Sequence, residues 1–379
     1  MTTINTKYCG KLTFYIEGTR STNEVAILTV HDIGCNHTQY IDFLKHSSME
    51  TLAPRCVWFN VVLPGQSVND PDLPSDYTYP TMQQIADDLI ECIGILSISH
   101  LIVFGEGAGA NILARMAMSG DERILGAVLL NCVGSTPNLV ESLKDKIIGW
   151  KLSTIGMTSS TENYLVVHRF GVMNNLESDE DLSTMINNYK KFLRDTFNSK
   201  NLHGYVTSYM NRSNLIDKNM TISQDISDSR QEDKQKVKKG KYREMEAETR
   251  ERKSSKCPAI KCPILFISGS LANYADDVKC LYEDIQGFLK NEPDRKRHIE
   301  FMEIDNCANV LVERTDQVAE SLQYFLQGQG LVGSAPSRRM SSTVRPIGNR
   351  KISMEEYDSP KGASNITYNP KRKYSESEN

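Results

Sequence analysis

The sequence has no apolar run that approaches the roughly 20 residues of a membrane-spanning helix. The first seven residues, Met1 to Lys7, contain no apolar stretch of the kind that forms the centre of a secretory signal. Neither an N-terminal Met-Gly pair nor a C-terminal prenylation box is present. These absences argue against an integral membrane segment and a covalent lipid anchor, and we expect a cytoplasmic protein.

Signatures of metals, cofactors and nucleic acids are also missing. The nine cysteines are scattered, with no C-x-x-C pair and no Cys/His cluster at zinc spacing. No G-x-G-x-x-G fingerprint and no phosphate-binding loop with a lysine occurs. The formal net charge of −4 argues against nucleic-acid binding by the molecule as a whole. We therefore expect no metal, no organic cofactor, no nucleic-acid partner, and cysteines that remain reduced thiols.

The sequence does contain short apolar runs that alternate with segments of helical periodicity. The apolar runs predict strands at residues 12–19, 24–30, 57–63, 101–104, 124–131, 263–269 and 298–304. Helical spacing of apolar residues predicts helices at about 82–93, 111–117, 275–289 and 314–326. This alternation indicates an α/β fold with a mostly parallel, doubly wound sheet.

The strand at 101–104 leads into a segment that resembles the nucleophile turn of α/β hydrolases. Gly105-Glu106-Gly107-Ala108-Gly109 follows the frame G-x-S-x-G, in which a strand ends in a sharp turn and a helix begins. The central position, where those enzymes keep their nucleophile, is Gly107, which has no side chain. Glycine also adopts the strained backbone of this turn at little cost. The turn therefore predicts a hydrolase scaffold with a degenerate nucleophile position.

The other two residues of a hydrolase triad belong in loops after late strands, in the order nucleophile, acid, histidine. After 263–269, Asp276 and Asp277 come several positions late, and we expect them to begin the following helix. The loop after 298–304 contains no histidine. Losing the activated serine or the histidine of a triad costs about a millionfold in turnover, or roughly 8 kcal/mol. Triad hydrolysis is therefore not expected.

Three polar residues, His31, Asp32 and Glu106, are candidates for a vestigial pocket. The pair His31-Asp32 resembles the metal-binding doublet of the HD phosphohydrolases, but that doublet lies on helices of an all-helical fold, whereas this one ends a strand. The competing interpretation, which we favour, is an oxyanion-hole loop whose backbone is hydrogen-bonded by His31 and Asp32. Glu106 is predicted to line or support the pocket rather than to catalyse a reaction.

Beyond these motifs, the pattern changes along the chain. Residues 133–215 predict helices only, as in a helical cap over the carboxyl ends of a sheet. Residues 217–256 are strongly charged and nearly free of aromatics, which indicates a disordered insert or a solvated helix. Residues 329–379 are rich in Ser, Pro, Lys and Arg, and predict a disordered tail. We expect one α/β-hydrolase-like domain over residues 1–328, followed by that tail.

These features together resemble the N-myc downstream-regulated (NDRG) family, a group of α/β-hydrolase-fold proteins regarded as lacking hydrolase activity. The resemblance runs in register from about residue 8 to 330. It is carried by Ala26–Gly34, Tyr79-Pro80, Gln84–Asp87, Gly107–Ala110, Ile112–Arg115, Gly156–Ser160, Asn211-Arg212 with Leu215, and Tyr324–Gly328. The chain departs from the family in its long insert, in Leu63-Pro64-Gly65 in place of an Asp-Ala-Pro-Gly type of segment, and in a tail without the tandem decapeptides of some members.

The resemblance implies a cytoplasmic pseudoenzyme that acts through protein partners in signal transduction, stress response or differentiation. A second class of function stays open, in which the cap-covered pocket binds a small molecule or supports cryptic hydrolysis. In the tail, Ser341, Ser342 and Ser353 follow basic pairs at a spacing that suits basophilic kinases, and phosphate would add about −1.5 to −2 charge at each. Lys371-Arg372-Lys373 leaves peripheral membrane contact open.

Overall fold

The computed structural model describes residues 1–19, 25–137, 139–171, 180–216, 259–290 and 298–333. The elements that follow belong to one unit of the chain, Met1–Gly333. The charged insert at 217–256, the serines Ser341, Ser342 and Ser353, and the basic run Lys371-Arg372-Lys373 lie outside the described residues.

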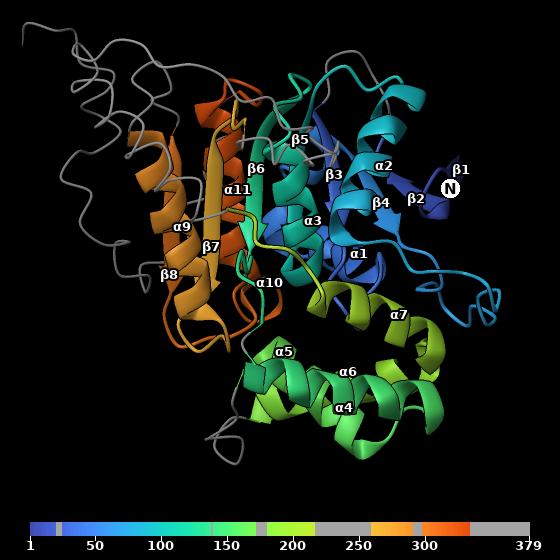
Figure 1. The fold of residues 1–379 in the computed structure, drawn as a ribbon. Helices are drawn as coiled ribbons and strands as arrows, with labels where there is room; N and C mark the ends of the chain where they lie inside the picture. The colour runs from blue at the N-terminus through green and yellow to red at the C-terminus, as the bar shows by residue number, and fades with distance from the viewer. Residues whose placement is uncertain (20–24, 138, 172–179, 217–258, 291–297, 334–379) are drawn as a thin grey trace, which may run out of the picture. The chain divides into compact units, whose positions relative to one another are not determined.

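Within the described residues, eight strands form one sheet in the order β1-β2-β4-β3-β5-β6-β7-β8 (Figure 1). Their bounds are Thr2–Thr6 (β1), Gly10–Glu17 (β2), Val25–Val30 (β3), Cys56–Val62 (β4), Leu101–Glu106 (β5), Ile124–Leu130 (β6), Ile264–Gly269 (β7) and Ile299–Ile304 (β8). The β1–β2 and β2–β4 pairs are antiparallel, and the remaining pairs are parallel. The predicted mostly parallel sheet is confirmed.

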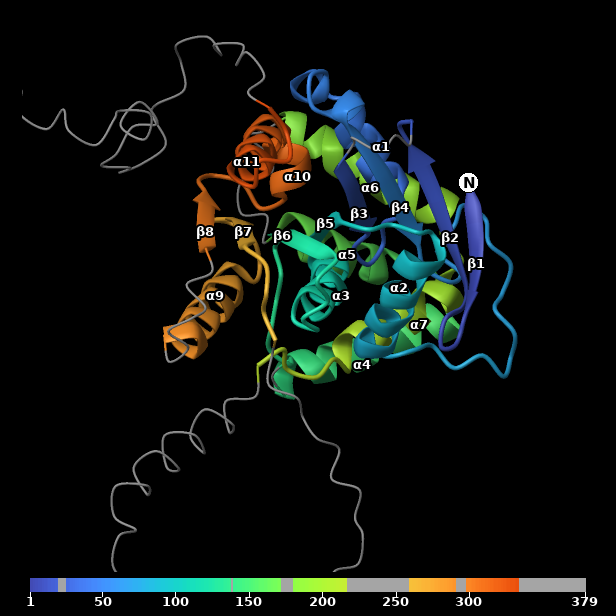
Figure 2. The same cartoon turned by 90° about the horizontal axis from the view of Figure 1, so that it is seen from above.

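Helices cover both faces of the sheet (Figure 2). One face carries α2 (Met82–Ile95), α3 (Gly107–Ala117) and α9 (Ala275–Lys290), and the other carries α1 (Thr38–Lys45), α10 (Val310–Glu313) and α11 (Thr315–Gly328). Two apolar cores result, one on each face. Every residue of β4 and β5 is buried, as expected for central strands that are covered on both sides. The α/β-hydrolase fold places the end of β5 near the middle of the sheet, where α3 begins.

Among the described residues between β6 and β7, four helices stand beyond the carboxyl ends of the strands (Figure 1). They are α4 (Leu139–Thr154), α5 (Ser159–Phe170), α6 (Glu180–Thr196) and α7 (Ser199–Met210), and we call them the cap. Capping residues begin two of them: Thr158 forms a capping box with Thr161, and the side chain of Asn198 accepts from two backbone N–H groups. Buried side chains of the cap, such as Leu165 and Tyr205, extend the core that contains α2 and α3.

Strand β1 and helix α1 are among the elements that the sequence patterns did not predict. In β1 only Ile4 is buried, so the strand has no apolar alternation to read, and it forms because it pairs with β2. Helix α1 buries only Tyr40 and Phe43 and has no side-chain cap at His37. Both elements therefore depend on tertiary contacts rather than on a local pattern.

Candidate functional site

Asp32 lies directly beyond β3, in a loop that several hydrogen bonds hold in place. Tyr40 donates through its hydroxyl to the carbonyl of Val30 (2.7 Å), and Tyr205 of the cap donates to the carbonyl of His31 (2.8 Å). The Nε2 of His31 accepts from the N–H of Leu63 (3.3 Å), which leaves Nδ1 to donate to the carbonyl of Asp32 (2.9 Å). Burial lowers the pKa of His31 to about 4, so this imidazole is neutral. Its two hydrogen bonds link the loop at Asp32 to the end of β4 at Leu63.

On the neighbouring strand, the turn from β5 into α3 depends on two glycines. Gly107 has a φ of +55°, a left-handed conformation that glycine adopts most easily. A Cβ at Gly109 would overlap the carbonyl oxygen of Val30, so glycine there lets α3 pack against the end of β3. The two turns consequently meet, and Asp32 lies beside Gly107.

The carboxylate of Asp32 occupies the space above Gly107. A Cβ placed on Gly107 would overlap Oδ1, Cγ and Oδ2 of Asp32. Its Oδ1 accepts from the backbone N–H of Ala108 (2.8 Å) and of Ile33 (2.8 Å). In α/β hydrolases the oxyanion hole consists of the N–H after the nucleophile and an N–H from the loop after an earlier strand. Ala108 and Ile33 are those two positions, so Asp32 fills the hole with a carboxylate oxygen of the protein itself.

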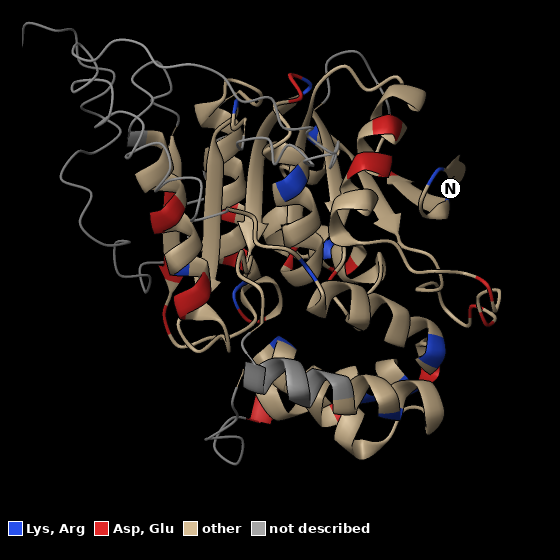
Figure 3. Cartoon of the chain, in the orientation of Figure 1, with Lys and Arg blue, Asp and Glu red and all other residues tan. Residues whose placement is uncertain are grey.

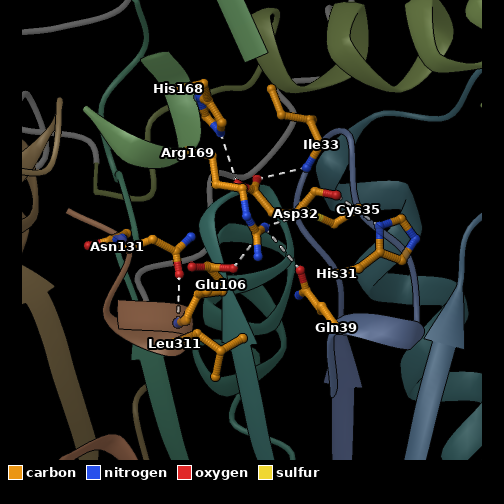
Figure 4. A network of polar contacts seen from close by, with 12 residues as sticks. His31, Asp32, Ile33, Cys35, Gln39, Glu106, Asn131, His168, Arg169 and Leu311 are labelled. Atoms are coloured by element: carbon orange, nitrogen blue, oxygen red, sulfur yellow. Dashed lines mark hydrogen bonds and ion pairs between the residues drawn. The ribbon is translucent and has the colours of Figure 1, made fainter. Parts of the chain in front are cut away.

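The second oxygen of Asp32 is bound by the cap. His168, on α5, lies with its Nε2 3.0 Å from Oδ2, and both side chains are about 95% buried (Figure 4). Burial pushes the pKa of Asp32 upward, but the His168 imidazole and the N–H groups of Ala108 and Ile33 favour the charged form. They hold the pKa of Asp32 below its usual value. Asp32 is therefore a fixed anion in contact with both the sheet and the cap.

The next residue of α5, Arg169, reaches Glu106 at the end of β5. Its Nη1 lies 3.4 Å from Oε2 of Glu106 and 3.3 Å from Oε1 of Gln39, and it also contacts Sγ of Cys35 (Figure 4). The guanidinium also lies over the ring of Tyr189, 5.2 Å from the centroid. Burial raises the pKa of Glu106 to about 7, an increase that Arg169 limits. Two adjacent carboxylates thus have opposite pKa shifts.

A cavity of about 20 Å³ lies next to this network. Asp32, Glu106, His168 and Arg169 line it, together with residues that include Asn131, Asn309 and Tyr274. Space of ~10–15 Å³ admits one water molecule, whereas pockets for small organic ligands measure roughly 300–1,000 Å³. The cavity therefore has room for one water molecule and not for an ester substrate.

Amide side chains follow β6 and β8, and the loop after β8 is where a hydrolase would keep its histidine. Asn131, after β6, accepts from Ser268 Oγ (3.1 Å) and donates to the carbonyl of Ala308 (3.1 Å), so it joins the ends of three strands. Asn309, after β8, accepts from the N–H of Val312 at the start of α10. Asp276 and Asp277 lie in the first turn of α9.

The structure thus brings Asp32 and Glu106 to the same cavity as Gly107, while His31 points away from it toward Leu63 (Figure 4). Among the described residues, no group of three His, Cys, Asp or Glu side chains is arranged to hold a metal ion. Sequence reasoning missed His168 and Arg169. They lie about 60 residues beyond the nucleophile turn in a segment with only helical periodicity, and nothing local marks them as site residues.

Solved structures similar to this chain are α/β hydrolases. A thermophilic esterase from Thermogutta terrifontis superposes with a TM-score of 0.60 at 14% identity, covering 86% of this chain and 98% of its own. An enol-lactonase from Burkholderia xenovorans superposes with a TM-score of 0.58 at 14% identity, covering 86% and 100%. At this identity the likeness establishes the fold alone.

Relatives in sequence extend the comparison. A Caenorhabditis elegans protein, "Uncharacterized protein ZK1073.1", is 28% identical over 368 residues, which cover 96% of this chain and 94% of that protein. Human "Protein NDRG2" is 26% identical over 343 residues, 89% of this chain and 76% of that protein. The model of the Ndr family matches residues 2–333. The resemblance seen in the sequence motifs is confirmed, and the chain belongs to the Ndr family.

Proposed function

We propose that this chain is a non-catalytic member of its family, which acts by binding protein partners and uses the site under the cap as a structural support. One observation carries the proposal: the Asp32 carboxylate accepts both N–H groups of the oxyanion hole and fills the space above Gly107. The hydrolase-fold neighbours are enzymes by their printed titles, whereas in this chain a carboxylate of the protein already occupies the two backbone donors of the hole.

The filled oxyanion hole removes a second requirement of acyl transfer, in addition to the missing nucleophile. Each donor of an oxyanion hole contributes about 10²–10³ in turnover, because it meets the negative charge that develops on the substrate oxygen. Here both donors already bind an anion. A substrate oxyanion would have to displace Asp32 or approach it, and like charges at such short range repel strongly. Acyl transfer at this position is therefore opposed in three ways. Asp32 already binds both donors, its negative charge repels a substrate oxyanion, and its carboxylate fills the space above Gly107.

The chemical part of the proposal is tested with the full-length protein and a panel of ester, thioester and epoxide substrates, together with a fluorophosphonate probe. We expect no turnover above buffer and no labelled protein. Turnover that is lost in Asp32→Asn or Glu106→Gln, and kept in the exposed-carboxylate control Asp72→Asn, would contradict the proposal. Asp72 pairs only with surface groups of the cap and its neighbouring loop, so its loss should leave the site intact.

The partner-binding part is tested by affinity capture from cells with the full chain and with a chain that ends at residue 328. None of the described helices is long and apolar enough to cross a membrane. We propose a cytoplasmic protein whose tail modulates binding in signalling, stress response or differentiation through phosphate at Ser341, Ser342 and Ser353. Alanine at these three serines should add or remove the same captured proteins as removal of the tail does. An identical captured set in all forms would overturn the role of the tail.

A second candidate function, binding of a very small polar molecule, is favoured by two unpartnered atoms. Within the described residues, Oε1 of Glu106 and Nδ1 of His168 are buried without a hydrogen-bond partner, and both residues line the cavity. Buried polar atoms of this kind usually bind something. A thermal-shift titration with formamide and with methanol tests this candidate. A change in melting temperature that saturates with ligand concentration in the native chain, and is absent in Glu106→Gln, would support this candidate. The same change in the native chain and in Glu106→Gln would contradict it.

A further inference from the structure

Three arginine side chains are buried in the part of the chain that the structure describes. Arg115, Arg169 and Arg212 are 6%, 7% and 6% exposed. Arg169 has a carboxylate partner in Glu106, but neither Arg115 nor Arg212 forms an ion pair with an acid among the described residues. A buried charge is normally paired, because moving it out of water without a counter-charge is costly. Two of the three buried arginines therefore have no anion beside them within the described structure.

These two arginines lie where the cap joins the rest of the fold. Arg115 is in the last turn of α3, and Arg212 follows α7; the basic residue of each element is blue in Figure 3. Arg115 donates through Nη2 to the carbonyl of Ser213 (2.6 Å) and through Nη1 to its Oγ (3.1 Å), which brings its guanidinium beside the residue after Arg212. The N–H of Leu215 donates to the carbonyl of Gly134 (2.9 Å), so the segments that enter and leave the cap run side by side here.

The charges of the two guanidiniums are close enough to oppose each other. Burial lowers the pKa of Arg115 to about 10, and the positive charge of Arg212 adds to this decrease. Cys132 and Asp87 act on Arg115 in the opposite direction, but burial raises the pKa of Cys132 to about 12, so its thiol is neutral at pH 7. Asp87 is exposed and accepts from Gln83 (3.0 Å). The positive charge at this junction therefore exceeds the negative charge that the described residues place beside it.

Arg212 also has hydrogen-bonding capacity that the described residues do not use. Its Nη1 donates to the carbonyl of Tyr209 (3.1 Å), and its guanidinium lies over the Tyr209 ring, 4.2 Å from the centroid. Its Nε is buried without a hydrogen-bond partner, whereas Nε of Arg115 donates to Asn111 (3.1 Å). Buried N–H groups are nearly always bonded, and arginine binds phosphate or carboxylate oxygens through two parallel N–H groups. The unpartnered Nε therefore points to a missing acceptor with more than one oxygen.

We propose that Arg212 and Arg115 bind a phosphate-type oxyanion at the junction of the cap and the sheet, with Nε of Arg212 as a direct donor. A phosphate group carries about −1.5 to −2 charge at pH 7, which matches two guanidiniums better than the single charge of a carboxylate does. The polar residues Gln83, Ser213 and Asn214 are exposed at this junction, so an ion can approach from solvent. The site uses residues other than those around Asp32, and it does not depend on the proposed partner binding.

The probe is inorganic phosphate, titrated into the full-length protein by isothermal titration calorimetry at constant pH and ionic strength. We expect saturable binding at one site per chain. Arg212→Gln should weaken this binding by about tenfold or more, because it removes a charge-assisted donor, and Arg115→Gln should weaken it as well. Arg194→Gln is the matched control, since Arg194 is exposed and already paired with Glu162 (2.7 Å), and it should bind like the native chain.

A second variant separates loss of the site from loss of the fold. Arg212→Lys keeps the positive charge but has no Nε, so it should melt like the native chain in phosphate-free buffer and still bind phosphate more weakly. The absence of saturable binding by the native chain would overturn the proposal, as would native affinity in Arg212→Gln or in Arg212→Lys. Acetate that binds as tightly as phosphate would overturn the assignment to a phosphate-type ion.

Discussion

The two sides of the cap differ in how completely their groups are matched. On the inner side, Asp32 is a buried anion whose oxygens meet two N–H groups and an imidazole, and Arg169 meets Glu106, Gln39 and a ring. On the outer side, Ile147 and Trp150 are 49% and 57% exposed. The position where a hydrolase keeps its nucleophile is thus filled by a carboxylate of the protein itself, whereas exposed apolar side chains lie on the outer side of the cap.

The largest expected effect comes from reintroducing a nucleophile. Gly107→Ser should lower the free energy of unfolding by about 4 kcal/mol, since serine is strained at a φ of +55° and its Cβ overlaps the carboxylate of Asp32. Urea denaturation measures this loss, and esterase activity should remain absent. Gly287→Ser is the control, because a Cβ at exposed Gly287 meets no atom within 4 Å. If overlap is the cause, Asp32→Ala should recover part of the loss in the double variant; a purely additive result would contradict it.

Glu106 should make stability depend on pH. Because burial raises its pKa to about 7, the folded chain binds a proton more tightly than the unfolded chain, whose carboxyl titrates near its usual 4.5. Stability then falls as pH rises through this window, by a total on the order of 3 kcal/mol. Urea midpoints at pH 5, 6, 7 and 8 should decline in the native chain and vary much less in Glu106→Gln. Asp32 acts in the opposite direction: its lowered pKa gives stability that is present above about pH 4 and lost below it. If the urea midpoints of the native chain and of Glu106→Gln fall equally between pH 5 and pH 8, a group other than Glu106 causes the pH dependence.

A smaller effect is expected where the cap touches the loop before Asp32. Tyr205→Phe removes the hydroxyl that donates to the carbonyl of His31, and should cost about 1 kcal/mol of unfolding free energy. Tyr324→Phe removes a hydroxyl that bonds Glu320 at an exposed position, and should change it by a few tenths at most. Equal losses in the two variants would mean that the cap does not depend on this bond.

The smallest effect on stability is expected on the outer side. Trp150→Ser should change the unfolding free energy by less than about 0.5 kcal/mol, because the side chain is 57% exposed. Leu152→Ala, two residues on and fully buried, should cost about 2–5 kcal/mol. A large loss for Trp150→Ser would show that this exposed side chain supports the fold.

Much of the architecture was predictable because its signals are local. Central strands such as β5 are buried along their whole length and read as unbroken apolar runs, and the glycines of the turn mark a strand that meets a helix. Asp32 and Glu106 were found for the same reason, since each ends a strand that the pattern predicts. Strand β1 and helix α1 were missed because they bury too few side chains to leave a period.

By itself, the sequence determined the scaffold, the family and the empty position at Gly107, because strand and helix periods and a missing side chain are properties of neighbouring residues. Only the tertiary structure decided what occupies that position. His168 and Arg169 come from a cap helix far along the chain, and the Asp32 carboxylate enters the oxyanion hole only because two separate strands end side by side. Such contacts join residues 60 to 140 positions apart, and no pattern within a single segment encodes them.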